Sequence, residues 1–170
     1  MQTLYRVLFG LLRVWLGFQW LQAGLGKLED PRWVGPEAGT AVRGFFAGAI
    51  AKATGDHPAV QPWYAWFLKN VAQPNAVVFS YLVPVGETLV GLALILGVAT
   101  TAAAVAGAFM NLNFMLAGTT STNPILFTAA MVLLFAGSKS WYYGLDRYLL
   151  AAIGRRLKGR GRAAGAHQGA

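Results

Sequence analysis

Four long apolar segments constrain the fold of this chain more than any other feature of its sequence. They cover residues 4–25, 76–98, 100–117 and 124–143. A helix that spans a bilayer needs about 20 mostly apolar residues, and each segment is close to or above that length. Only 12% of the residues are charged, about half the fraction usual in a soluble domain. The sequence therefore predicts an all-α, polytopic membrane protein built as a bundle of four transmembrane helices.

The segments that connect the four spans predict their arrangement. The links around residues 97–101 and 118–123 are short, which makes the helices that they join antiparallel. The segment 28–75 is much longer, and within it residues 41–54 favour a short helix, whereas residues 63–67 form an aromatic cluster. Such segments are typical of the headgroup level of a membrane. We expect this long loop to carry short interfacial helices, either as a lid over the bundle or as one wall of a binding site.

The distribution of positive charge predicts the orientation of the chain. The net charge is +8, and the last apolar segment is followed by Arg155, Arg156, Lys158, Arg160 and Arg162. A basic stretch directly after a span indicates a cytoplasmic position and contact with anionic lipid, not with nucleic acid. We therefore predict a membrane domain over residues 1–150 with both termini cytoplasmic and residues 28–75 outside. Residues 151–170 are expected to form a disordered basic tail.

The residue types that are absent exclude several kinds of chemistry on this chain. There is no cysteine, which excludes disulfides, iron–sulfur clusters and thiol redox chemistry. The two histidines, His57 and His167, lie in a predicted loop and in the terminal tail. We therefore expect no metal, haem or flavin on this chain, and no motif for nucleophilic catalysis or phosphate binding is present.

Charged residues inside the predicted spans are candidates for a functional site, because a charge in the bilayer is costly unless it is paired or solvated. Arg13 lies in the first span and Glu87 in the second. Counted along each helix, both lie roughly 14–17 Å from the cytoplasmic face. This common depth predicts an Arg13–Glu87 ion pair, which either has a catalytic role or locks the bundle.

Small and amide residues predict which helix faces are inside the bundle. Gly10, Gly17 and Gly24 recur every seven residues and should face other helices, because small residues allow close approach in membranes. Asn111 lies on the small-residue face of the third span and should point inward. Asn113 lies about 200° away around the helix and should face a different neighbour. Either amide can serve a ligand or only join helices.

The order of these motifs resembles the DoxX family, and within it the DoxD-like branch, the membrane subunit of thiosulfate:quinone oxidoreductase. The resemblance covers roughly residues 5–150, and it rests on four elements: Arg13 followed by GLGK at 24–27, VGETLVGLALILG at 85–97, MNLNFMLAG at 110–118 with NP at 123–124, and AG at 136–137 with YGLDR at 143–147. It implies four membrane helices in a prokaryotic plasma membrane, electron delivery from thiosulfate to a membrane quinone, and a second, small subunit as partner.

The resemblance and the polar residues together suggest a quinone site. Trp20, Trp63 and Tyr81 can stack on the ring, Lys27, Asn111 and Glu87 can bind its carbonyls, and Glu87 or Asp146 can pass protons. The candidate site residues are Glu87 and Arg13 as catalytic groups, and Trp20, Lys27, Asn111, Asn113 and Trp63 as quinone-binding groups. The alternative is a non-catalytic scaffold subunit of a respiratory or redox-stress complex. Transport ranks last, because the sequence has neither inverted repeats nor broken helices.

The predicted orientation can be tested with topology reporters. A reporter fused at residue 55 should be active only outside the membrane, and one fused at the C-terminus only in the cytoplasm, because the basic tail follows an even number of spans. Alkaline phosphatase and green fluorescent protein fusions measure the two locations. Finding the C-terminus outside would show the orientation to be wrong.

Overall fold

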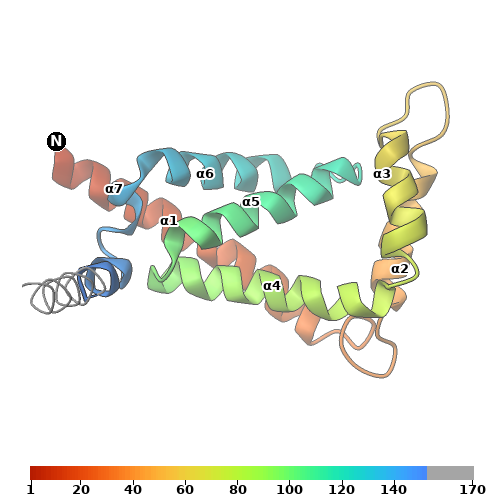
Figure 1. The fold of residues 1–170 in the computed structure, drawn as a ribbon, viewed down its shortest axis with the longest axis horizontal. Helices are drawn as coiled ribbons and strands as arrows, with labels where there is room; N and C mark the ends of the chain where they lie inside the picture. Colours follow the sequence, from red (N-terminus) through yellow and green to blue (C-terminus); the bar gives the residue numbers. More distant parts are fainter. Residues whose placement is uncertain (153–170) are drawn as a thin grey trace, which may run out of the picture.

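A computed structural model describes residues 1–152, and all regular structure in this range is helical. Four long helices lie along the length of the molecule (Figure 1): α1 (Gln2–Leu28), α4 (Ala76–Leu96), α5 (Thr100–Leu116) and α6 (Asn123–Ala136). The all-α prediction is confirmed for the described residues. The predicted tail at 151–170 lies almost entirely outside them.

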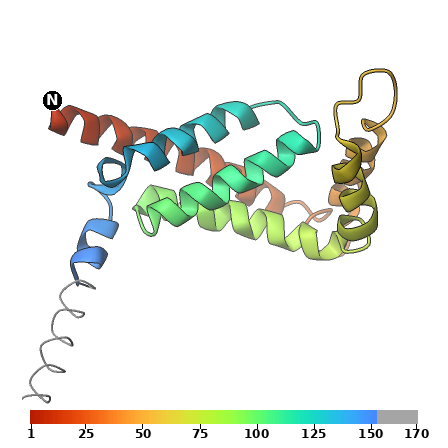
Figure 2. The same cartoon turned by 45° about the horizontal axis from the view of Figure 1, so that its top comes forward.

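Shorter helices occupy the two ends of the bundle. At one end, α2 (Thr40–Ala51), α3 (Pro62–Phe67) and the π-helix η1 (Leu68–Ala72) stand across the long helices (Figures 1 and 2). We call these three helices the cap. At the other end, α7 (Ser138–Trp141) and a helical stretch over residues 146–152 lie near the N-terminus. The long predicted loop thus contains helices, as expected, and these pack against one end of the bundle.

The fourth apolar segment is broken where the sequence predicts a continuous span. α6 ends at Ala136, because Gly137 has φ 54° and ψ −127°, a conformation outside the helical region. A new helical turn, α7, starts directly afterwards. At its other end α6 begins at Asn123, after Thr122, and the Asn123 side chain donates a hydrogen bond to the Thr119 carbonyl at 3.1 Å.

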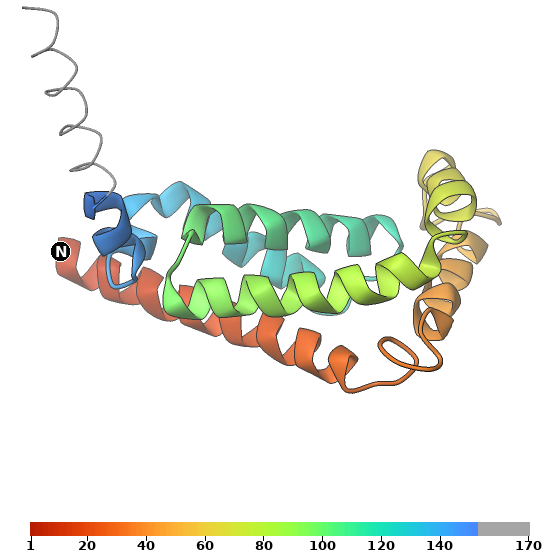
Figure 3. The ribbon, with the colours of Figure 1, turned by 60° about the horizontal axis from the view of Figure 1, so that its bottom comes forward.

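Close backbone contact joins α1 and α4, which run side by side (Figure 3). A Cβ added at Gly91 would lie 2.5 Å from the Leu21 nitrogen and 2.8 Å from the Gly17 oxygen. One at Gly24 would collide with Thr88 of α4. Gly17 and Gly24 of the predicted glycine stripe therefore face another helix, as small residues do where helix backbones meet in membranes, whereas a Cβ at Gly10 would meet only the Tyr143 ring, at 3.8 Å.

Polar groups lie inside the bundle and large apolar groups lie on its surface. The buried polar and charged residues are Arg13, Ser80, Glu87, Thr100, Asn111, Ser140 and Asp146. Large apolar side chains on all four long helices are exposed, and the exposed fraction of Phe135 in α6 is 84%. A soluble monomer rarely exposes so much contiguous apolar surface. The arrangement is that of a protein whose outer surface contacts an apolar medium.

Within residues 1–152, one helix is both long and apolar enough to cross a membrane by length and composition, namely α4. α1 is longer but carries Arg6, Arg13 and Lys27. α5 and α6 are apolar but have only 17 and 14 residues.

The cap has a hydrophobic core of its own. Val42, Phe46 and Ala49 of α2 pack there with Tyr64 and Leu68. The predicted helix at 41–54 is therefore present, and it buries one face. Two hydrogen bonds tie the cap to the end of α5, from Tyr64 to Asn113 and from Lys52 to the Gly118 carbonyl. The cap is thus a packed layer, held on the bundle by defined contacts.

The α1–α4 contact can be tested at Gly91. Gly91→Ala should destabilise the protein by about 1–3 kcal/mol, because the new methyl group meets backbone atoms that cannot rotate away. Thermal unfolding in detergent measures the effect. Gly26→Ala in α1 is the control, since a Cβ there would meet nothing within 4 Å. Equal melting temperatures for Gly91→Ala and the parent would contradict the observed packing.

Candidate functional site

A cavity of about 750 Å³ lies where the cap meets the four long helices. Its wall is mainly apolar, with aromatic and aliphatic side chains, and it carries a smaller set of polar groups. The aromatic part consists of Trp20, Trp33, Phe45, Phe46, Tyr64, Phe67, Phe79, Phe109 and Phe114. The polar part consists of Lys27, Glu87, Gln19, Gln22, Asn113, Thr119, Ser121, Thr122 and Asn123. Ligand pockets often have this size and this combination of groups.

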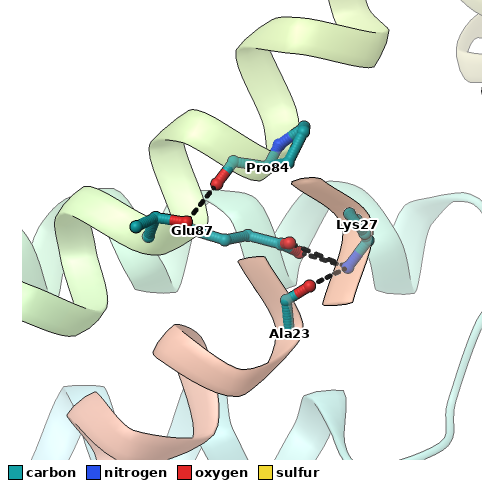
Figure 4. A network of polar contacts seen from close by, with 5 residues as sticks. Ala23, Lys27, Pro84 and Glu87 are labelled. Atoms are coloured by element: carbon teal, nitrogen blue, oxygen red, sulfur yellow. Dashed lines mark hydrogen bonds and ion pairs between the residues drawn. The ribbon is translucent and has the colours of Figure 1, made fainter. Parts of the chain in front are cut away.

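Lys27 and Glu87 form a salt bridge at the wall of this cavity. The Lys27 ammonium donates to both Glu87 carboxylate oxygens, at 2.8 and 3.0 Å, and to the Ala23 carbonyl at 3.3 Å (Figure 4). Glu87 is only 1% exposed, whereas Lys27 is partly buried. The Lys27 nitrogen also lies 5.6 Å from the centre of the Trp33 ring. The pair joins α1 to α4 and is the part of the cavity wall that carries charge.

The predicted Arg13–Glu87 ion pair is wrong. The Arg13 guanidinium donates to the Leu94 carbonyl at 2.9 Å and packs against Gly97 and Gly144. The contacts of Gly17 and Gly24 with α4 explain the difference, because they set a register in which Arg13 is level with the end of α4. Glu87 lies seven residues earlier than Leu94, or about 10 Å along the helix. The common depth predicted from the sequence required the start of α1 to lie level with the end of α4, whereas in the structure Arg13, well inside α1, lies level with the end of α4.

The other predicted site residues divide into two groups. Trp20 and Asn113 line the cavity together with Lys27 and Glu87. Trp63 does not line it and is 60% exposed, because α3 turns Tyr64 inward instead. Asn111 points into the bundle as predicted, but it is 0% exposed and is not part of the cavity wall. Neither side-chain atom of its amide has a hydrogen-bond partner among the described residues.

Tyr64 holds Asn113 in place. The Tyr64 hydroxyl lies 3.1 Å from both the side-chain oxygen and the backbone carbonyl oxygen of Asn113 and can donate to either one, while the Asn113 amide nitrogen donates to the Phe109 carbonyl at 2.8 Å. Burial raises the pKa of the Tyr64 hydroxyl, which keeps it protonated as a donor. Sequence reasoning missed Tyr64. Its position in the 63–67 aromatic cluster was the available signal, but the inward-facing member could not be identified without the cap's packing.

Asp146 lies at the opposite end of the bundle from the cavity. Its two carboxylate oxygens accept hydrogen bonds from the backbone nitrogens of Ala99 and Thr100, at 2.7 and 2.8 Å. This is how a carboxylate caps the first turn of a helix, here α5. Tyr81 is also outside the cavity wall. Neither residue is placed to act on a ligand in this cavity.

The cavity can therefore orient a polar ligand atom against one ammonium–carboxylate pair and hold a flat ring among aromatic side chains. In the described part of the chain, no group of three or more histidine, cysteine or acidic residues is arranged to hold a metal ion. The chemistry that the wall itself offers is hydrogen bonding and proton exchange at Lys27 and Glu87.

The Lys27–Glu87 contact can be tested with a double-mutant cycle. Lys27→Met should cost about 3–5 kcal/mol, because it leaves the buried Glu87 carboxylate without a partner. Adding Glu87→Gln should recover part of the loss. Melting temperatures in detergent report the coupling.

A second cycle supplies the control. Arg13→Gln combined with Glu87→Gln should be close to additive, because the two side chains share no contact. Strong coupling between Arg13 and Glu87, without coupling between Lys27 and Glu87, would contradict the observed pairing.

Comparison with known proteins identifies the family. The profile of one protein family, described as TQO small subunit DoxD, matches residues 8–158. No curated protein and no solved structure matches the chain. The matched range contains the four long helices, apart from the first turns of α1, and the whole cap. The chain therefore belongs to the DoxD family, the family of a small membrane subunit of thiosulfate:quinone oxidoreductase.

Proposed function

We propose that this protein is a membrane subunit of a thiosulfate:quinone oxidoreductase and that it binds quinone in the Lys27–Glu87 cavity. The observation that carries the proposal is an ion pair with a buried carboxylate in the wall of a largely apolar cavity that is rich in aromatic side chains. A charged pair at this position is costly in a membrane protein and is expected mainly where it serves a ligand.

The chemistry of the cavity wall suits a quinone. A quinone is a flat ring with two carbonyl oxygens, and its reduction takes up two electrons and two protons. Lys27 has three N–H donors, and its 3.3 Å bond to the Ala23 carbonyl is longer than its two bonds to Glu87. A ring carbonyl can replace that third bond while the ion pair stays intact. We assign to Lys27 the orientation of the carbonyl, and to Lys27 with Glu87 the delivery of protons.

An apolar tail has a route out of the cavity. Leu82 of α4 and Phe109 of α5 line the cavity and are also 60% and 64% exposed on the bundle surface. A membrane quinone carries an apolar chain that must stay in lipid. Because these two side chains face both the cavity and the outer surface, we assign the exit of the chain to this side of the bundle.

The proposal includes four membrane spans with the cap on the outer side and both termini in the cytoplasm of a prokaryote. α4 is about 32 Å long and α5 about 26 Å, against an apolar bilayer thickness of about 30 Å. α6 alone is about 21 Å long, so α7 is needed to complete the fourth span. The exposed leucine and phenylalanine side chains of these helices support their contact with lipid.

The proposal also includes a partner subunit. The chain has no cysteine, and its charged cavity groups are an amine and a carboxylate. These groups move protons but do not carry electrons from a sulfur compound. We therefore assign thiosulfate oxidation to a second small subunit that passes electrons to the quinone.

Two matched pairs of variants test the quinone site. Asn113→Leu and Phe67→Ala change the cavity wall, whereas Asn111→Leu and Trp66→Ala change neighbours on the same helices that do not line it. Asn113→Leu and Phe67→Ala should each weaken binding of a short-chain quinone about tenfold. Their controls on the same helices, Asn111→Leu and Trp66→Ala, should leave binding unchanged. Quenching of tryptophan fluorescence measures affinity, because Trp20 and Trp33 line the cavity. Extraction of the purified parent should release bound quinone.

A non-catalytic scaffold is the second candidate function. The observation in its favour is that Glu87 already has both oxygens bonded to Lys27, which is what a purely structural pair requires. If the parent releases no quinone on extraction and binds none in the fluorescence titration, the scaffold function replaces the quinone site. Equal losses in both members of each pair would show that the effect arises from general destabilisation.

A further inference from the structure

Positive charge converges on one aromatic ring at the end of the bundle opposite the cavity. The guanidinium carbons of Arg6 and Arg147 lie 3.8 and 4.6 Å from the centre of the Tyr142 ring. Next to Arg6 in the chain, Tyr5 has the ammonium of Lys139 at 5.9 Å from its ring centre. The three cations come from α1, α7 and the 146–152 stretch. We call this group of five residues the Tyr142 cluster.

No acidic residue of the chain balances the Tyr142 cluster. The chain has six aspartate and glutamate residues. Four of them lie between α1 and α3 in the sequence, toward the cap: Glu29, Asp30, Glu37 and Asp56. Glu87 forms its salt bridge with Lys27. The sixth is Asp146, whose oxygens accept from the N-terminal amides of α5. Residues 153–170 contain no aspartate or glutamate. Two guanidinium groups on one ring repel each other, so an anionic group of another molecule bound between them would be stabilised.

The surface around the cluster is apolar. Leu4 and Leu8 of α1 are 60% and 50% exposed. Phe135, which precedes Lys139 by four residues in the chain, is almost fully exposed. Tyr5 and Tyr143 are also about half exposed. Tyrosine and arginine at the end of apolar helices are typical of the level of lipid headgroups. The molecule that supplies the negative charge therefore meets an apolar surface beside it.

We propose that the Tyr142 cluster binds the phosphate of an anionic phospholipid, with the acyl chains along the exposed faces of α1 and α6. Guanidinium groups bind phosphate oxygens through paired N–H donors and stack on aromatic rings, and Arg6 and Arg147 offer both contacts. A free phosphate ion would use only the cations and would leave the apolar surface uncovered. An acidic segment of a partner protein would supply charge but no acyl chains.

Lipid binding to the full-length protein tests the proposal. The protein is delipidated in nonionic detergent and titrated with dioleoyl phosphatidylglycerol or dioleoyl phosphatidylcholine, and native mass spectrometry counts the bound lipid. The parent should prefer phosphatidylglycerol. The double variant R6Q/R147Q should bind it about 25-fold more weakly, about fivefold for each cation lost, with phosphatidylcholine unaffected.

Two double variants with the same loss of charge are the controls. R43Q/K69Q removes two exposed cations of the cap region, and R160Q/R162Q removes two from the terminal segment. Both should bind phosphatidylglycerol within about threefold of the parent, because each leaves the five residues of the Tyr142 cluster unchanged. Equal losses in either control would attribute the binding to general charge and overturn the proposal.

Three further results would overturn the site. The first is that the parent shows no preference for phosphatidylglycerol. The second is that a folded R6Q/R147Q variant binds phosphatidylglycerol as the parent does. The third is that inorganic phosphate displaces the lipid at equal concentration. If the double variant does not fold, R147Q alone, at an exposed position, replaces it. In the parent, phosphatidylglycerol with a photoreactive headgroup should label the peptide 139–147. Labelling confined to other peptides would also overturn the site.

Discussion

The backbone contact between α1 and α4 is the constraint on which the rest of this structure depends. Gly17, Gly24 and Gly91 allow the two helices to approach so closely that no side chain separates them. Close contact leaves little freedom for one helix to slide along the other. The register that results brings Lys27 opposite Glu87 and places Arg13 at the end of α4. A shift of one turn would break both arrangements.

The two inward-facing cations of α1, Arg13 and Lys27, have different roles because of that register. Lys27 faces a cavity and forms a salt bridge with a carboxylate. Arg13 lies where α4 ends, against Gly97, and binds a backbone carbonyl that no helical amide can reach. Asp146 completes this second centre by capping α5. One polar centre thus serves the cavity, and the other holds the α4–α5 turn to the C-terminal part of the bundle.

The cap turns an open end of the bundle into a cavity. Its aromatic side chains, among them Phe45, Phe46 and Phe67, supply one wall, and α1, α4 and α5 supply the others. The bond from Tyr64 to Asn113 and the bond from Lys52 to the Gly118 carbonyl hold this wall against α5. A layer held in this way gives the ion pair an enclosed setting, where hydrogen bonds and charges act more strongly than in water.

Much of this protein was predictable from the sequence because helices and apolar surfaces depend on local patterns. Apolar length predicted α1, α4 and α5, the spacing of Gly17 and Gly24 predicted a helix-facing stripe, and a charge in an apolar segment singled out Glu87, which is buried at the cavity wall. Each of these features requires only residue type and spacing along one helix.

The partner of each charge could not be predicted in that way. Whether Glu87 meets Arg13 or Lys27 depends on the register of two helices far apart in sequence, and that register is set by backbone contacts at Gly17, Gly24 and Gly91. The cavity wall depends likewise on the packing of the cap, which turns Tyr64 inward and Trp63 outward, although the two residues are neighbours of similar chemistry.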